Sequence, residues 1–174
     1  PSQVSRTVNF LNALLSAGCI LFLFWSITRL VRSLLKEEKE NLSVTDVIII
    51  LGSGLVGALA YTFSDTFWFS AVEGEVYAFS SFLTALVFWM ILRWQDESDT
   101  VYGDRWIILI AYIIGLSIGV HLLNLLCIPA IVLVFYYQKY RTISLKGAIA
   151  AIALSGLLIV LILFVYIQIG RAHV

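Results

Sequence analysis

Charged side chains are scarce in this sequence: Asp, Glu, Lys and Arg together account for only 13% of its 174 residues. Hydrophobic residues make up 61% and gather in runs that are longer than the core of a soluble domain of this size requires. This composition excludes an ordinary soluble globular protein. The sequence predicts a polytopic membrane protein.

Neither sign of charge is in excess, because Lys plus Arg and Asp plus Glu number 11 each. Net charge therefore gives no indication of a nucleic-acid partner, and we expect none. Cysteine is also rare. Cys19 and Cys127 both fall inside apolar runs, where we expect them to pack as small hydrophobic side chains and neither to bind a metal nor to form a disulfide.

The sequence has no initiator Met and no recognisable signal peptide at its start, so we expect a truncated chain. At the other end, residues 169–174 ("IGRAHV") match the translation of a widely used sequencing adapter. We expect those residues to be adapter read-through. Residues 1–168 are then one partial transmembrane domain.

Hydrophobic stretches cover residues 8–27, 44–63, 78–92, 106–137 and 147–167. The fourth is too long for one crossing, since as a single helix it would run about 48 Å against a hydrocarbon core of roughly 30 Å. If it crosses twice, turning at residues 119–123, every Lys and Arg before residue 169 except Arg6 falls on the cytoplasmic side. The positive-inside rule thus predicts an all-α transmembrane bundle of about six spans.

This topology places Asp65, Glu73, Glu75 and His121 on one extracytoplasmic face. The acids lie in "SDTFWFSAVEGEVYA", among Phe and Trp at a membrane boundary, where a carboxylate must reach water or meet a partner. If residues 72–77 are helical, Glu73 and Glu75 point about 200° apart. We then expect one to face inward and the other solvent, the alternative being that both are ordinary acids of the headgroup region.

Two further polar residues lie at the expected turn of the long stretch. His121 is either a polar turn residue or a functional group. Asn124 is either a helix cap or the partner of an interhelical hydrogen bond. The sequence leaves both choices open.

A glycine motif at Gly52, Gly54 and Gly57 matches the G-x-G-x-x-G pattern of dinucleotide-binding folds. The apolar run continues through it, so we interpret these glycines as sites where membrane helices approach closely. The same interpretation applies to Gly115 and Gly119.

Two segments resemble a known family: "FWFSAVEGEVYAFSSFLTALVFWMILRW" and "RWIILIAYIIGLSIGVHLLNLLCIPAI". They are similar to bacterial membrane proteins related to the eukaryotic transmembrane protein O-mannosyltransferases, which belong to the GT-C glycosyltransferases. The likeness is strongest over residues 61–129. It implies part of a GT-C-like membrane domain that moves a mannose-like sugar from a polyprenyl-phosphate carrier to an extracytoplasmic protein or glycan acceptor. It also implies a place in the bacterial inner (cytoplasmic) membrane, in contact with the lipid bilayer.

The resemblance implies catalytic roles for Glu75 and Glu73, with the principal base expected upstream of Pro1. The substrate-binding residues that it implies, together with the polar residues of the same outer face, are Asp65, Trp68, Tyr77, His121 and Asn124. A lysine is commoner in the family at the position of His121. We predict no metal site from a lone carboxylate, no cofactor is certain, and a divalent cation is left open.

A secondary transporter is the alternative, with Glu73, Glu75 and His121 relaying protons and the long stretch forming a discontinuous helix. Transporters bury such groups near mid-membrane and carry repeated halves, whereas these acids lie at the end of a span and we find no repeat. That difference favours the enzyme. A purely structural membrane subunit is a third class, in which neutralising all three positions would leave function intact.

Overall fold

The computed structural model describes residues 2–38, 41–74, 76–140 and 144–172. Its elements are α1 (Ser2–Glu38), α2 (Val44–Thr62), α3 (Asp65–Val72), α4 (Tyr77–Glu97), α5 (Asp104–Val120), the 3₁₀ helix η1 (Leu122–Leu126), α6 (Cys127–Lys139) and α7 (Leu145–Ala172). These ranges contain no strand. The predicted all-α fold is confirmed.

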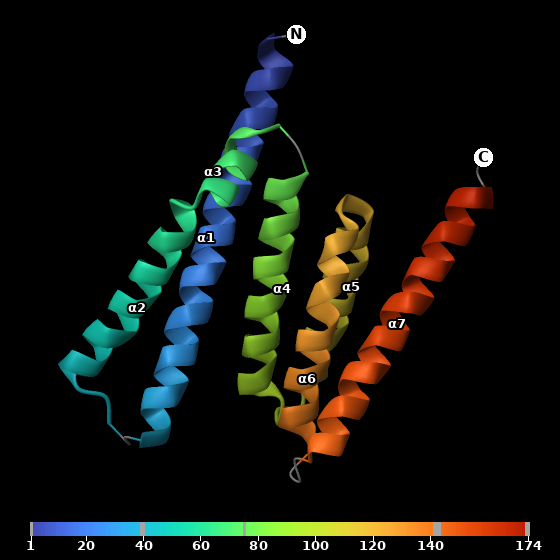
Figure 1. Ribbon diagram of the computed structural model, residues 1–174. Helices are drawn as coiled ribbons and strands as arrows, with labels where there is room; N and C mark the ends of the chain where they lie inside the picture. The colour runs from blue at the N-terminus through green and yellow to red at the C-terminus, as the bar shows by residue number, and fades with distance from the viewer. Residues whose placement is uncertain (1, 39–40, 75, 141–143, 173–174) are drawn as a thin grey trace.

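Helix α4 lies at the centre of the bundle (Figure 1). It packs against α1 on one side and against α5 and α6 on the other, while α2 packs on α1 and α7 on α6. The bundle has two ends. We call the end with α3, the start of α4 and the turn between α5 and η1 the α3 end, and the other the opposite end.

Four helices, α1, α2, α4 and α7, are long and apolar enough to cross a membrane. The long stretch at residues 106–137 is broken at His121, whose backbone is extended with φ −156° and ψ 128°. Helix α5 rises about 26 Å, and η1 with α6 about 30 Å, which is close to the hydrocarbon thickness. Helix α5 leads toward the α3 end and α6 leads back from it, and both pack on α4 (Figure 1). The predicted reversal of this stretch is therefore confirmed.

The position of Pro129 and a backbone hydrogen bond at His121 explain how α6 can start soon after the break. Pro129 is the third residue of α6, and in the first turn of a helix its missing N–H has no intrahelical partner to lose. The carbonyl of His121 meanwhile accepts a hydrogen bond from the Asn124 N–H at 3.3 Å. The new helix thus begins without breaking an interior hydrogen bond.

The glycine motif lies within α2, so it forms no strand-to-helix phosphate loop. A Cβ added at Gly57 would lie 2.6 Å from Ile27 Cδ1, and one added at Gly54 would collide with Thr28 of α1. The packing interpretation is confirmed for these two glycines. It is wrong for Gly52, Gly115 and Gly119, where an added Cβ would meet no described atom within 4 Å.

Ion pairs join the helices at the opposite end. Arg29 of α1 donates to both carboxylate oxygens of Asp96 at the end of α4, at 2.8 and 2.6 Å. Glu97 accepts from Arg93 at 2.7 Å and from the indole N–H of Trp106 on α5 at 2.8 Å. Charged groups therefore cross-link α1, α4 and α5 away from the α3 end.

Candidate functional site

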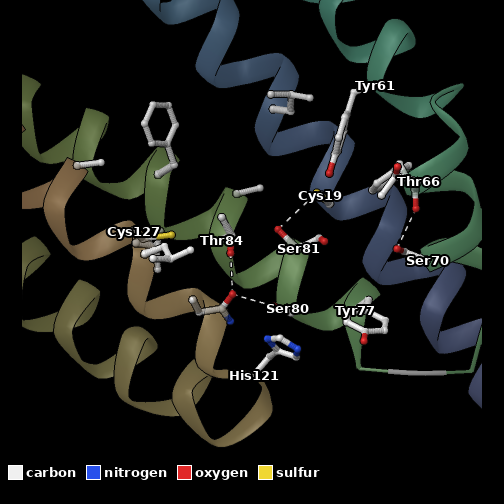
Figure 2. A pocket seen from close by; sticks show the side chains of 18 of the residues that line it. Cys19, Tyr61, Thr66, Ser70, Tyr77, Ser80, Ser81, Thr84, His121 and Cys127 are labelled. Carbon is white, nitrogen blue, oxygen red and sulfur yellow. Dashed lines mark hydrogen bonds between the residues drawn. The ribbon is translucent and has the colours of Figure 1, made fainter. Parts of the chain in front are cut away.

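A cavity of about 660 Å³ lies between α1, α3, α4 and the η1–α6 arm, and Tyr61 of α2 also reaches it. Just over half of the lining side chains are apolar. The polar ones are Tyr61, Thr66, Ser70, Tyr77, Ser80, Ser81, Thr84, His121 and Asn124. Figure 2 shows the labelled members of this set turned toward one space from several helices. We call this space the α4 cavity.

One face of α4 forms the floor of the α4 cavity. Lining residues recur along it at helical spacing, from Tyr77 through Ser80, Ser81 and Thr84 to Phe88. The distance from first to last is about 16 Å at 1.5 Å per residue. The cavity therefore extends from the α3 end roughly half way through a hydrocarbon core of about 30 Å.

Asn124 forms the polar centre of the cavity wall. Its side chain is only 4% exposed, and its Oδ1 accepts hydrogen bonds from Ser80 Oγ at 2.7 Å and Thr84 Oγ1 at 2.9 Å (Figure 2). Those hydroxyls are one turn apart on α4. Asn124 is thus the interhelical hydrogen-bond partner that the sequence offered as one of two choices, and it does not cap α6, whose N-cap residue is Leu126.

Tyr77 and His121 meet where the cavity approaches the α3 end. Their ring centroids are 5.5 Å apart, with the planes inclined by 50°. Both line the cavity (Figure 2). Three of the predicted substrate-binding residues, Tyr77, His121 and Asn124, therefore come together from two separate parts of the chain.

Neither of the predicted acids that the structure describes, Asp65 and Glu73, lines the cavity. Glu73 is exposed and lies just after α3 with an extended backbone, φ −78° and ψ 134°. Helix α3 ends at Val72 and α4 begins at Tyr77, so residues 72–77 do not form one helix. The angle of about 200° between the two acids depended on that helix and does not apply. Glu75 lies outside the described residues, and its catalytic role stays a prediction.

Asp65 and Trp68 also lie apart from the cavity wall. Both belong to α3, and both are exposed, Trp68 to 55%. The cavity is instead lined from α3 by Thr66, Phe67 and Ser70. Substrate contacts at Asp65 and Trp68 stay predictions for the outer surface of the α3 end.

Sequence reasoning missed the hydroxyl groups of α4. Ser80 and Thr84 stand one turn apart in an apolar span, a spacing that could have indicated a polar stripe facing another helix. It also missed that both cysteines reach the same cavity, Cys19 from α1 and Cys127 from α6. Both thiols are free of disulfides, and Cys19 Sγ donates to the Ser81 carbonyl at 3.4 Å.

The described part of the chain contains no cluster of side chains that could bind a metal ion. No three His, Cys, Asp or Glu side chains gather there as a metal site requires. The described lining of the α4 cavity also contains no Asp, Glu, Lys or Arg. Its polar groups are neutral hydroxyls and an amide, together with one imidazole.

Comparison with protein families identifies the chain. The family model described as the protein O-mannosyl-transferase TMEM260 N-terminal domain matches residues 1–144, which is most of the 174 residues. The chain therefore belongs to this family, and the predicted relation to protein O-mannosyltransferases is confirmed. No curated protein and no solved structure matches it.

Proposed function

We propose that this member of the protein O-mannosyl-transferase family transfers a mannose-like sugar from a polyprenyl-phosphate carrier to an extracytoplasmic protein or glycan acceptor. The observation that carries the proposal is the α4 cavity, an apolar space within a membrane bundle that ends at polar groups near an acidic connection. A lipid-linked donor has the same two parts. It combines an apolar chain with a polar, phosphorylated sugar.

Such a reaction needs a base that takes the acceptor's proton and groups that stabilise charge on the departing phosphate. In this proposal the carboxylates of Glu73 and Glu75 act on the sugar or the acceptor at the α3 end. His121, at the α3 end of the cavity, contacts the phosphate. Glu73 supports this assignment because it follows α3 directly and its side chain is exposed to solvent.

The orientation in the membrane is part of the proposal. Arg29, Arg93 and Lys139 belong to the opposite end, at or near the C-terminal ends of α1, α4 and α6. The positive-inside rule favours the cytoplasm for that end. The α3 end, with Asp65, Glu73 and the Tyr77–His121 contact, then faces the extracytoplasmic side of a bacterial inner membrane.

The decisive experiment measures transfer of labelled mannose from a polyprenyl-phosphate donor by the full-length protein that contains this chain. We expect Glu75→Gln and Glu73→Gln to lower the initial rate, the more important carboxylate by a factor of about 100 or more. Asp99→Asn is the matched control, because Asp99 is exposed at the opposite end. Full activity in both glutamine variants would remove these carboxylates from the mechanism.

The transporter alternative receives less support from the geometry. Its proposed relay joins Glu73, Glu75 and His121, yet the chain reverses direction at His121 at one end of the bundle (Figure 1). A discontinuous transporter helix is interrupted near mid-membrane and continues across. Absence of sugar transfer together with proton-coupled uptake in vesicles would favour the transporter.

A further inference from the structure

Helix α3 presents an exposed apolar face. Positions i, i+3, i+4 and i+7 of a helix share one face, and in α3 they are occupied by Asp65, Trp68, Phe69 and Val72. All four residues are exposed, Trp68 to 55%, Phe69 to 63% and Val72 to 57%. We call this surface the outer face of α3. Large apolar side chains that are exposed side by side indicate contact with a membrane or with another protein.

The other side of α3 is held by the bundle. Its residues Thr66, Phe67 and Ser70 line the α4 cavity. Phe67 is only 4% exposed, and its ring centroid lies 4.7 Å from that of Tyr61 on α2. The helix also packs against α1 and α4. These contacts fix the rotation of α3 about its own axis, so the outer face points away from the bundle.

Two contacts of α1 indicate the membrane depth at which α3 lies. Arg29 is paired with Asp96 at the opposite end, and such charged groups stay out of the hydrocarbon. Asn12, nearer the start of α1, donates to the backbone carbonyl of Glu73. From Asn12 to Arg29 the helix rises about 26 Å, which is close to a hydrocarbon thickness of roughly 30 Å. Glu73 therefore lies near the second membrane boundary, as does α3, which ends one residue before it.

The residue types of the outer face match the boundary between lipid and water. Trp is enriched at that boundary, and interfacial helices bury Trp and Phe there. Asp65 excludes full immersion in hydrocarbon, because its carboxylate must reach water or a headgroup. The preceding span α2 is exposed at Val56 and Leu59, so the apolar surface of the bundle continues into α3. A lipid interface is therefore the partner that fits this face.

We propose that the outer face of α3 lies in the interfacial region of the bilayer at the α3 end, with Trp68 and Phe69 inserted between the headgroups and the first acyl carbons. Helix α3 then separates this interface from the α4 cavity. The assignment replaces the predicted substrate contact of Trp68 with a lipid contact. Because Glu73 directly follows α3, the same anchor sets the membrane depth of that carboxylate.

Spin labels on single cysteines measure this depth. In the full-length protein that contains this chain, the native cysteines are replaced by Ala, and Trp68→Cys, Phe69→Cys and Val72→Cys are labelled with a nitroxide in phospholipid nanodiscs. Electron paramagnetic resonance then measures collisions with O₂, which concentrates in lipid, and with a neutral nickel chelate, which stays in water. We expect the labels at positions 68 and 69 to report a depth of about 5–10 Å in the boundary between headgroups and acyl chains.

Three further labels calibrate the measurement. Leu55→Cys is the lipid reference, because Leu55 is 54% exposed within the span α2. Val101→Cys is the water reference, since Val101 is 93% exposed between α4 and α5. Ser70→Cys is the matched control on α3 itself, because Ser70 is the neighbour of Phe69 but lines the α4 cavity. Its label should collide less often with O₂ than the label at Phe69.

Three results would overturn the inference. Labels at positions 68 and 69 that meet the nickel chelate as often as the label at Val101 would place the outer face in water. Protection from both reagents, as for Ser70, would show that another protein segment covers it, and a depth equal to that of Leu55 would place α3 within the hydrocarbon. If the Trp68 variant does not fold, Phe69 and Val72 provide the same test. The measurement involves no sugar transfer, so failure of the proposed function would leave its result unchanged.

Discussion

Asn12 donates a hydrogen bond from its side-chain Nδ2 to the backbone carbonyl of Glu73, which lies 61 residues further along the chain. Asn12 belongs to α1 and is only 5% exposed. Gly74, which follows Glu73, also lies close to α1, since a Cβ added at Gly74 would lie 3.4 Å from Val8. Helix α1 therefore anchors the connection between α3 and α4 that carries the predicted catalytic acids.

Replacing Asn12 by Ala should loosen this connection. We expect amide hydrogen exchange at residues 73–77 to rise by about fivefold, because one buried hydrogen bond contributes about 1 kcal/mol. Thr7→Ala is the control, since Thr7 is exposed on the same helix and its hydroxyl donates within α1 to the Gln3 carbonyl. If exchange rises equally in both variants, or in neither, the anchoring role of Asn12 is refuted.

The contact between α1 and α2 gives a second prediction. A side chain at Gly54 would collide with Thr28 and would lie about 3.0 Å from Phe24, whereas one at Gly52 would meet nothing within 4 Å. Gly54→Val should therefore lower the free energy of unfolding by about 1–3 kcal/mol through overpacking, and Gly52→Val should change it much less. Denaturation in mixed micelles, followed by circular dichroism, measures both, and equal loss in the two variants would show that α1 and α2 do not pack in this register.

A third prediction concerns the ion pair between α1 and α4. Arg29 and Asp96 form two hydrogen bonds, but the Asp96 side chain is 47% exposed, so solvent screens the pair. A double-mutant cycle with alanine at both positions should give a coupling free energy of about 0.5–1 kcal/mol that falls as salt is added. Arg32→Ala combined with Asp96→Ala is the control, since Arg32 is exposed and we expect that pair to be additive. A salt-independent coupling would indicate a packing effect.

The sequence predicted those features that depend on local chemistry or on the membrane. Charge placement predicted the reversal near His121, and the apolar context of Gly54 and Gly57 predicted helix packing. It did not predict α3, because residues 65–72 are aromatic and lie at a membrane boundary, where an interfacial loop and a short helix have similar composition. Ser64 and Asp65 are residue types that favour a helix start, but the eight residues that follow are too few to show a clear helical period.

The α4 cavity could not be predicted, because its walls come from distant segments. Cys19 and Cys127 line one space only because α1 and α6 flank α4 on different sides. The hydrogen bonds of Asn124 to Ser80 and Thr84 likewise depend on how the η1–α6 arm packs on α4. Hydrophobic patterning locates the long apolar helices, but it does not specify which of their faces meet.

The reversal of the chain at His121 makes a final prediction about the sidedness of two loops. Val101 lies between α4 and α5 and is 93% exposed, and Leu145 at the start of α7 is 78% exposed. If α5 and the η1–α6 arm each cross the membrane once, cysteines placed at the two positions lie on the same side of the membrane. Both should be unreactive toward an impermeant maleimide in intact cells and should react after permeabilisation.

Phe63→Cys is the reference for the other side, since Phe63 is 72% exposed at the end of α2 near α3. It should react in intact cells if the α3 end is extracytoplasmic. Reaction at Val101→Cys and Leu145→Cys instead, with Phe63→Cys protected, would keep the hairpin and invert the orientation. Reaction at only one of the first two would mean that the stretch crosses the membrane once, and then Tyr77, His121 and Asn124 could not share a cavity at one end of the bundle.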